Sequence, residues 1–514
     1  MAAGGLIVAL WACSPRLYGV AKHRYADAEV AMALGEHDAA HAALEDVLDA
    51  RSRTDAVKVA ILLTDVLALY GRGDWEAGLD RAQDALSLAD ELGMVEEFAP
   101  EAWMGIGHGS RELGRIEEAL EAYRAADDAI VVRDGPQHLD RLSAAEQQAG
   151  MLARLERHGE AEEVLRDRLE LAERVLDEGD LGLAEARRDL AANLSWRWRH
   201  REGLELLRAA EPVLAIYADP REHQVVLQML VAVEEKQGEF DAALLDLERV
   251  DALDGSPALD AWVRSWRGDT LRGMDRLDEA LDVHARAVRL AADAPGPHER
   301  HLSRALVDLA LTQSRRGAGE EALVLLERAD AAATRVEDVA VVARSRASVL
   351  VRLERGEEAL ELLAQLVPVE ATGGPWASDR AELELLRARA LVVLARGEEA
   401  EQAARQALRA YDELAGAQAW QTGHAWEALG RALTLQGRDE AALDAYQAAI
   451  TRLRRAYGVQ SATVALVRAR LGRLMAAVDD PAGAPELRSA LADLEARLGP
   501  EHPRVVEVRG WIDG

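Results

Sequence analysis

The sequence has very little cysteine and lysine, and it contains no long apolar run. Cys13 is the only cysteine, which excludes a disulfide framework and any zinc or iron–sulfur site built from several cysteines. No stretch of eighteen apolar residues occurs, so no segment is predicted to span a bilayer as a helix. Lys22, Lys58 and Lys236 are the only lysines and none follows a glycine, which excludes a phosphate-binding loop of the usual Gly-Lys form.

Basic residues are also outnumbered by acidic ones. The 514 residues include 61 Lys+Arg and 92 Asp+Glu, a net charge of −31. Because an acidic surface repels phosphate groups, we expect no nucleic-acid partner. Nearly all basic residues are arginine and alanine is abundant, a composition that indicates a GC-rich bacterial genome.

Alternating strand patterns are missing as well. Apolar residues recur at steps of three and four, which is the period of a helix packed on one face. Alanine, leucine, glutamate and arginine all favour helix. An apolar share of 49% excludes wholesale disorder. The predicted fold class is therefore all-α.

Two segments far apart in the chain nearly copy each other. Residues 103–126 have the sequence WMGIGHGSRELGRIEEALEAYRAA, and residues 426–449 have WEALGRALTLQGRDEAALDAYQAA. The residues shared at equal offsets are Trp103, Gly107, Gly114, Ala119, Tyr123 and Ala126 in the first copy and Trp426, Gly430, Gly437, Ala442, Tyr446 and Ala449 in the second. This pattern resembles the tetratricopeptide repeat, a pair of antiparallel helices whose small residues let the two helices cross closely.

Two small residues twelve positions apart recur along the chain, and we call them the first-helix and second-helix anchors. The first-helix anchors are Ala28, Val66, Gly107, Ala149, Ala191, Val231, Gly268, Ala310, Ala347, Ala388, Gly430 and Gly472. The second-helix anchors are Ala40, Gly78, Ala119, Ala161, Gly203, Ala243, Ala280, Ala322, Ala359, Ala400, Ala442 and Ala484. All but two of these positions hold alanine or glycine, so the repeat covers nearly the whole chain.

The anchors lie 37 to 42 residues apart, which is longer than the commonest tetratricopeptide period. This spacing, with Leu-Gly-Pro-Glu-His-Pro at residues 498–503, resembles the variant found in kinesin light chains. The resemblance implies a single right-handed α-solenoid, or superhelix, of about twelve antiparallel helix pairs over residues 17–512. A capping helix is expected at residues 501–512, and residues 1–16 form a short apolar segment before the array.

Glycine marks half of the predicted turns between paired helices. It stands five residues before the second-helix anchor at Gly35, Gly73, Gly114, Gly238, Gly317 and Gly437. Glycine suits the left-handed residue that ends a helix, so these positions predict tight turns. The turns near Glu156 and Trp198 lack this glycine, so they are assigned from the anchors alone.

A search for catalytic motifs finds little. Gly105, Gly107 and Gly109 lie inside a predicted first helix with no strand before it, which favours close packing over a nucleotide loop. The sequence His-Glu-Arg-His at residues 298–301 misses the zinc-protease spacing by one residue. His37 and His41 are four apart but lack a third ligand. We therefore expect no enzyme activity, no cofactor and no metal.

The most informative surface is the predicted concave groove, which the first helices line. Arg389, Arg431 and Arg473 each follow a first-helix anchor by one residue, and Arg344 and Arg470 occupy nearby groove-facing offsets. Stacked repeats would align these side chains as a ladder that suits carboxylates or phosphates. Alternatively, the arginines pair with local acids such as Glu382, Glu384 and Glu427 on a solvated face.

The charge distribution directs attention to the same third of the chain. Residues 381–514 hold 17 basic and 19 acidic residues, a net of −2, whereas the first 380 residues carry a net of −29. The anchor-plus-one offsets include no asparagine, so the clamp by which some relatives bind chaperone tails is absent.

Two pairs of tryptophans have different expected roles. Trp262 and Trp266 lie one turn apart and are predicted to face the groove, where they would contact a partner unless adjacent repeats cover them. Trp103 and Trp426 occupy the packing offset of the repeat and are predicted to be core.

The amino terminus allows two interpretations. Residues 2–12 are a short apolar run, and Leu-Trp-Ala-Cys at residues 10–13 resembles a bacterial lipoprotein cleavage site. No basic residue precedes the run, which favours an apolar segment that caps the first repeat of a cytoplasmic protein. The alternative is a lipid anchor at Cys13 on a lipoprotein that faces the periplasm.

The predicted function is that of a non-catalytic scaffold that binds a partner protein or peptide in its groove, with acidic segments favoured in the C-terminal third. One alternative is a sensor whose superhelical pitch responds to a small ligand or peptide. Others are a lipid-anchored envelope assembly factor and a helical-toroid enzyme, which would need a closed ring and clustered acids.

Overall fold

The described part of the chain is helical throughout. The computed structural model describes residues 20–49, 55–197, 199–253, 257–293, 299–370, 377–415, 420–459 and 461–513. These residues form 25 helices, the number expected for twelve helix pairs and a capping helix. The predicted all-α solenoid is confirmed, whereas its right-handedness stays a prediction. Cys13, the segment 1–16 and Trp198 lie outside the described residues.

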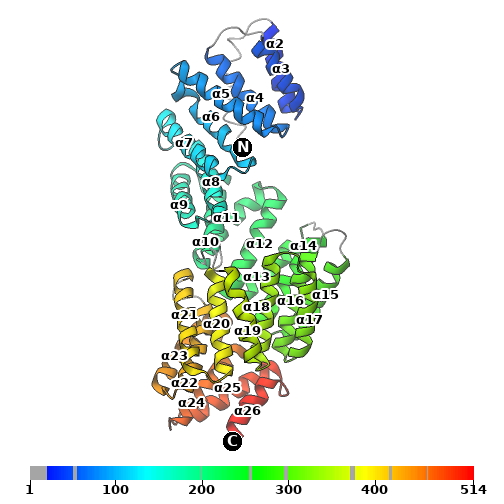
Figure 1. Cartoon of the computed structure of the whole chain (residues 1–514), viewed down its shortest axis with the longest axis vertical. Helices are drawn as coiled ribbons and strands as arrows, with labels where there is room; N and C mark the ends of the chain where they lie inside the picture. Colours follow the sequence, from blue (N-terminus) through cyan, green and yellow to red (C-terminus); the bar gives the residue numbers. More distant parts are fainter. Residues whose placement is uncertain are drawn as a thin grey trace. The chain divides into compact units, whose positions relative to one another are not determined.

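The chain divides into two compact units, Met1–Asn193 and Leu194–Gly514, and the boundary falls inside α10 (Leu181–Trp196). The helices of the first unit are α2 (Val20–Ala33), α3 (His37–Asp49), α4 (Ala56–Gly71), α5 (Trp75–Glu91), α6 (Val95–Glu112), α7 (Ile116–Asp134), α8 (Asp140–Arg154) and α9 (His158–Val175) (Figure 1). Whether the array is continuous over residues 17–512 stays a prediction.

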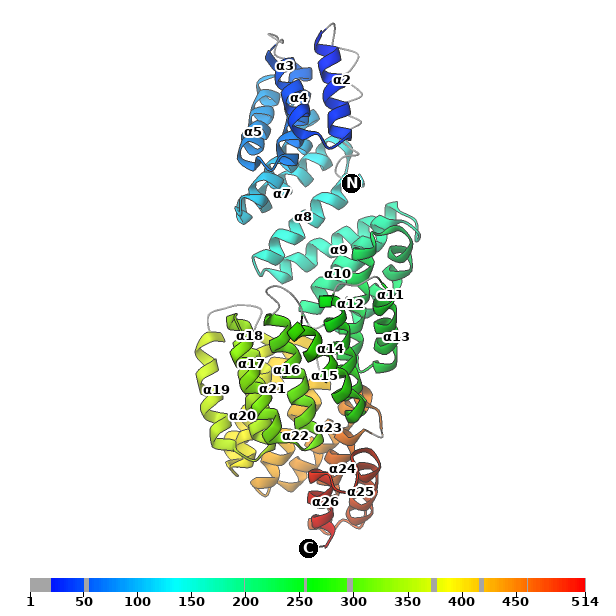
Figure 2. The same ribbon diagram turned by 90° about the vertical axis from the view of Figure 1, so that its right-hand side faces the viewer.

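The second unit holds the remaining helices, and consecutive ones lie side by side in both views (Figures 1 and 2). They are α11 (His200–Tyr217), α12 (Pro220–Gln237), α13 (Phe240–Asp251), α14 (Pro257–Gly273), α15 (Leu277–Asp293), α16 (Glu299–Arg316), α17 (Gly319–Ala332), α18 (Val336–Arg352), α19 (Gly356–Glu370), α20 (Ala377–Val393), α21 (Gly397–Ala415), α22 (Trp420–Leu435), α23 (Asp439–Tyr457), α24 (Ala462–Ala477), α25 (Gly483–Leu498) and α26 (Pro503–Asp513). The capping helix predicted at 501–512 is α26.

Tight turns with one left-handed residue connect the paired helices. All six glycines predicted at these turns have positive φ, between 69° and 103°. Five further turns place another residue type at that position with φ of 57–60°, namely Glu156, Asp275, Glu354, Ala395 and Asp479. The amide after the left-handed residue bonds back five residues in both kinds, as in Arg115 to Ser110 (2.8 Å) and Arg157 to Leu152 (2.9 Å).

The small anchors let the paired helices approach closely. A Cβ atom on Gly107 would lie 2.5 Å from the ring of Tyr123, and one on Gly430 would lie 2.9 Å from the ring of Tyr446. Ala119 and Ala442, which pair with these glycines, are fully buried. Any larger residue at the glycines would push the two helices apart, so the anchors determine how the pair packs.

One anchor was assigned wrongly. Ala484 is exposed, and the residue before it, Gly483, is buried in the position that an anchor occupies. A Cβ atom on Gly483 would lie 2.2 Å from the backbone nitrogen of Ala476. The anchors of the last pair are therefore eleven positions apart rather than twelve, because Gly483 follows the left-handed residue Asp479 by four positions where the other second-helix anchors follow theirs by five.

The cores are built from alanine and leucine with a few aromatic side chains. The cluster around α20 to α24 buries Tyr411 and Tyr446 among alanines and leucines. Among the described helices, none combines the length and the apolar character needed to cross a bilayer.

Candidate functional site

Six arginines come together in the second unit, and we call them the arginine cluster. Each belongs to a different first helix of a pair or to the capping helix α26. They are Arg315 (α16), Arg352 (α18), Arg389 (α20), Arg431 (α22), Arg470 (α24) and Arg504 (α26). Each either affects the pKa of another cluster member or of the nearby carboxylate Glu427, or has its own pKa affected by them.

Acidic residues neutralise only part of the cluster. Glu427 forms ion pairs with Arg470 and, at 3.5 Å, with Arg389. Burial raises the pKa of Glu427, but Arg470, His424 and Arg389 together hold it well below its usual value, so this carboxylate is ionised. Arg315 pairs with Asp275 at 2.6 Å.

The other three arginines have no acidic partner within the described residues. Burial lowers the pKa of Arg352 well below its usual value, and Arg504 and Arg315 lower it further. Burial and the nearby Arg470 lower the pKa of Arg431 to about 10, and the same two causes lower that of Arg504 to about 10. Burial is the larger cause at each of the three arginines, and repulsion from neighbouring arginines adds to it.

This crowding occurs in a place that water reaches. Arg352 is exposed to solvent, although the protein around it is dense enough to shift its pKa. Arg431 and Arg504 are half-buried. A charged ligand from solution can therefore reach the cluster.

The second unit closes on itself around this region. Asp275 at the α14–α15 turn accepts a bond from the backbone amide of Ala462 at the start of α24 (2.7 Å). The ring of His502, just before α26, bonds the carbonyl of Arg315 (2.9 Å). Phe240 at the start of α13 stacks on Tyr457 at the end of α23, with ring centroids 6.1 Å apart. Helices about 200 residues apart in sequence are thereby joined.

The structure brings together three of the five predicted ladder arginines, Arg389, Arg431 and Arg470. Arg344 lies 3.9 Å from Glu382 instead. Arg473 is exposed, and its guanidinium lies over the ring of Trp511, 4.9 Å from the centroid. The ladder is therefore not a line of anchor-plus-one residues.

Sequence reasoning missed Arg315, Arg352 and Arg504. Arg315 and Arg352 share a signal, because each follows its first-helix anchor by five residues, in or next to the last turn of the helix. Arg504 has no such signal. It lies in the capping helix and reaches the cluster through the closure, which a repeat pattern does not predict.

Trp262 and Trp266 on α14 are half-buried, and their ring centroids lie 5.5 Å apart. They line a pocket together with Ser265, Asp269, Arg304, Ala305 and Asp308 from α14 and α16. Adjacent repeats thus cover the pair only in part. Trp103 and Trp426 are also half-buried, and each packs against a hydrophobic core cluster.

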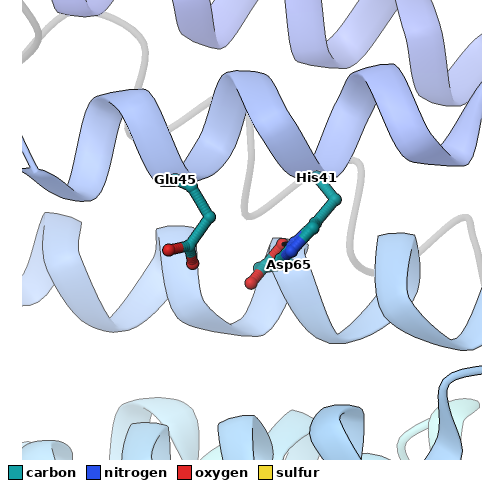
Figure 3. A group of neighbouring side chains, drawn as sticks. All are labelled: His41, Glu45 and Asp65. Atoms are coloured by element: carbon teal, nitrogen blue, oxygen red, sulfur yellow. Dashed lines mark hydrogen bonds and ion pairs between the residues drawn. The ribbon is translucent and has the colours of Figure 1, made fainter.

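A charged network in the first unit involves one of the two histidines considered as a metal pair. His41 and Glu45 on α3 point toward Asp65 on α4 (Figure 3). His41 Nδ1 lies 2.5 Å from one oxygen of Asp65, and Arg81 Nε lies 3.0 Å from the other. His37 lies instead against the backbone of Gly71. His37 and His41 therefore contact different residues.

Comparison with known families agrees with this architecture. The helix pairs, anchors and turns define an all-α helical-repeat solenoid. Residues 259–335 match the model of the tetratricopeptide repeat family. The match covers α14 to α17, which include the tryptophan pocket and Arg315, so this part of the chain consists of tetratricopeptide repeats.

Solved structures give weaker similarities. The Cut9–Hcn1 hetero-tetramer of the APC/C has a chain 14% identical to this one, with a TM-score of 0.44 and 96% of both chains covered. A tetratricopeptide repeat protein from Parabacteroides merdae is 14% identical, with a TM-score of 0.37 and 56% of this chain and 98% of that chain covered. BtubC (BKLC) from P. vanneervenii is 20% identical, with a TM-score of 0.32 and 46% and 92% covered. No curated protein matches the sequence.

Proposed function

We propose that this protein is a non-catalytic interaction scaffold that binds an acidic segment of a partner protein at the arginine cluster. The observation that carries the proposal is that Arg352, Arg431 and Arg504 have no acidic partner among the described residues. Burial and neighbouring arginines lower the pKa values of all three. Tetratricopeptide repeats support the scaffold role in general, and the cluster supports the preference for acidic segments.

Carboxylates suit this surface for physical reasons. A guanidinium presents a planar fork of donors that bonds a carboxylate in two places. Each carboxylate that binds would reduce the electrostatic repulsion among the arginines. The loss of this repulsion would make the free energy of binding more favourable. The net charge of −31 over the whole chain would disfavour an acidic partner on other faces, which restricts where it docks.

A direct binding experiment tests the proposal. The probe is a fluorescently labelled peptide of ten glutamates, titrated with the full chain and followed by anisotropy, with a ten-lysine peptide for comparison. We expect the glutamate peptide to bind, with an affinity that falls as salt rises. The triple variant R352Q/R431Q/R504Q should weaken binding by about 100-fold, because three charged contacts are lost.

The matched control is R473Q, which removes an arginine of the same charge that contacts Trp511 instead. It should bind the glutamate peptide as the parent chain does. Equal affinity for the triple variant and the parent, or an equal loss in R473Q, would contradict an acidic-segment site at the cluster.

The sensor alternative has one observation in its favour. Arg315 belongs to the cluster and also takes part in the closure, through Asp275 and through His502. A ligand that draws the Arg315 guanidinium away from Asp275 would weaken that contact. Solution scattering with and without the glutamate peptide distinguishes the two functions, since a rigid scaffold keeps its radius of gyration and a sensor changes it.

The location of the protein is a separate proposal. We infer a cytoplasmic protein, with a lipid anchor at Cys13 as the alternative. Metabolic labelling with a fatty-acid analogue in a bacterial host decides between them, because C13S removes the label only if Cys13 carries the lipid.

A further inference from the structure

Beneath the tryptophan pair, three side chains that could ligate a metal converge from three consecutive helices. Asp269 lies on α14, His284 on α15 and Asp308 on α16. One ligand atom from each lies within 4.8 Å of the others, and all three residues are buried. The two carboxylates also line the tryptophan pocket, which therefore provides a path from solvent to the three side chains.

His284 is the anomalous member of the group. Its side chain is fully buried, yet neither ring nitrogen has a hydrogen-bond partner. Buried polar groups are almost always paired, because leaving one unpaired costs free energy. Asp269 Oδ1 lies 3.5 Å from Nε2, and it forms an ion pair with Arg272 at 2.8 Å but accepts no hydrogen bond.

The other repeats show that packing does not require a histidine here. The ring of His284 lies against the anchor Gly268, as Tyr123 lies against Gly107 and Tyr446 against Gly430. The residues four positions after the second-helix anchor in the remaining pairs are Leu44, Ala82, Leu165, Leu207, Leu247, Leu326, Leu363, Ala404 and Leu487. Only the pair α14–α15 places an imidazole at this position among the described pairs, and there it meets two buried carboxylates.

We propose that Asp269, His284 and Asp308 form a binding site for a divalent transition-metal ion such as Zn²⁺. One nitrogen and two carboxylate oxygens are a donor set that such ions accept. The 3.5 Å between His284 Nε2 and Asp269 Oδ1 is close to the donor separation of about 3.4 Å that a tetrahedral ion with bonds of about 2.1 Å requires. The pocket leaves room for water as the remaining ligand.

Two arginines compete with the ion for the carboxylates. Arg272 lies 2.8 Å from Asp269 Oδ1, and Arg304 lies 3.1 Å from Asp308 Oδ1. They neutralise the two acids when no metal is bound. The Arg304 side chain is 57% exposed, so it can turn into solvent when an ion arrives. Removing Arg304 should therefore strengthen metal binding, an outcome that a purely structural ion-pair network would not give.

The cluster in the first unit provides a contrast. His41, Glu45 and Asp65 are also close enough to hold a metal (Figure 3). There, however, His41 already bonds Asp65, and Arg81 bonds both Asp65 and Glu45. The histidine of that cluster therefore has a hydrogen-bond partner, which His284 lacks, so we propose no ion there.

Calorimetric titration of the chelator-treated full chain with Zn²⁺ tests the site, and Co²⁺ absorption reports its coordination. We expect one ion that is lost in H284Y and in D308N. H284Y keeps the packing that tyrosine gives at Gly107 and Gly430, and circular dichroism confirms that each variant is folded. R304Q should bind about tenfold more tightly, because a competing cation is gone.

H41Q is the matched control, since it removes a histidine from the similar cluster in the first unit. Its Zn²⁺ binding should equal that of the parent chain. The proposal is overturned if the parent binds no Zn²⁺, if H284Y and D308N bind as the parent does, or if H41Q loses the ion instead.

Discussion

The two units are built from the same repeat but balance their buried charges differently. In the first unit, the fully buried Asp65 is bound by His41 and Arg81, and Arg81 also bonds Glu45. In the second unit, the arginine cluster surrounds one carboxylate, Glu427, and three of its members lack an acidic partner among the described residues. A balanced network stabilises a fold, whereas a surplus of one sign leaves capacity for a ligand of the other sign.

The turns show a second difference between the units. Gly114 in the first unit and Gly238 in the second have nearly the same φ, 76° and 77°. Around Gly114, a Cβ atom would meet nothing within 4 Å, whereas at Gly238 it would lie 2.0 Å from the carbonyl oxygen of Ala456. The same turn is therefore open in one unit and part of the closure in the other.

The variant G238A should give the largest stability effect. Its methyl group must push α23 away in addition to adopting a left-handed backbone, so we expect a loss of about 3 to 4 kcal/mol in the free energy of unfolding. Chemical denaturation followed by circular dichroism measures the loss, and hydrogen exchange at α23 locates it.

G114A is the control for the backbone cost alone and should lose about 1 kcal/mol. If the two variants lose the same stability, Gly238 has no special role and the contact between α12–α13 and α23 does not close the unit.

The next largest effect is expected for R81Q in the first unit. Removing the guanidinium leaves the buried Asp65 with His41 as its partner, and breaking such a buried pair should cost about 2 to 3 kcal/mol. The measurement is thermal unfolding combined with hydrogen exchange at α4. R115Q removes an exposed arginine of the same unit and should change stability by less than about 0.5 kcal/mol.

The fold could be predicted from the sequence because its signals are local. Small residues at a fixed spacing, such as Gly107 with Ala119, and turn glycines such as Gly114 act within one helix pair. The error at Ala484 shows the limit of this reasoning, because the anchor lies one residue closer to the left-handed residue of the turn, where glycine and alanine are adjacent and the pattern accepts either. Turns without glycine, such as that at Ala395, could be placed only from the spacing of the anchors on the two flanking helices.

The candidate sites were predicted less well because they depend on contacts between distant repeats. Arg389, Arg431 and Arg470 were found by offset, but Arg504 meets them only through the closure. His284 was missed because its neighbours Asp269 and Asp308 lie on other helices, and no spacing within one helix brings them together. An unusual residue at a packing position, His284 where other repeats have leucine, alanine or tyrosine, was the available signal.

The pH dependence of stability should be shared between the units. Burial lowers the pKa of His108 in the first unit to about 4, and that of His424 in the second unit also to about 4. Each histidine takes up a proton near pH 6.5 when unfolded but only near pH 4 when folded. The unfolded chain therefore binds more protons in this interval, and the stability present above pH 6.5 is lost as the pH falls toward 4.

H108F should remove the contribution of the first unit to the pH dependence of stability. Phenylalanine keeps the ring contact with Tyr123, whose centroid lies 5.5 Å from that of His108, but cannot be protonated. Thermal unfolding of parent and variant at several pH values between 4 and 7 should show a smaller loss in H108F. A loss of the same size in both would mean that His108 is protonated as easily in the folded chain as in the unfolded one.

The smallest expected effect has the opposite sign to that of R81Q. R352Q removes a charge that has no acidic partner among the described residues and that Arg504 and Arg315 repel, so it should raise the free energy of unfolding slightly, by less than about 1 kcal/mol. Thermal unfolding at low and high salt measures the gain, which should shrink as salt screens the repulsion. Adding the ten-glutamate peptide should reverse the order, because the parent chain gains more from the peptide than R352Q does. A loss of stability in R352Q comparable to that in R81Q would show that the second unit balances its charges as the first unit does, and the difference between the units would disappear.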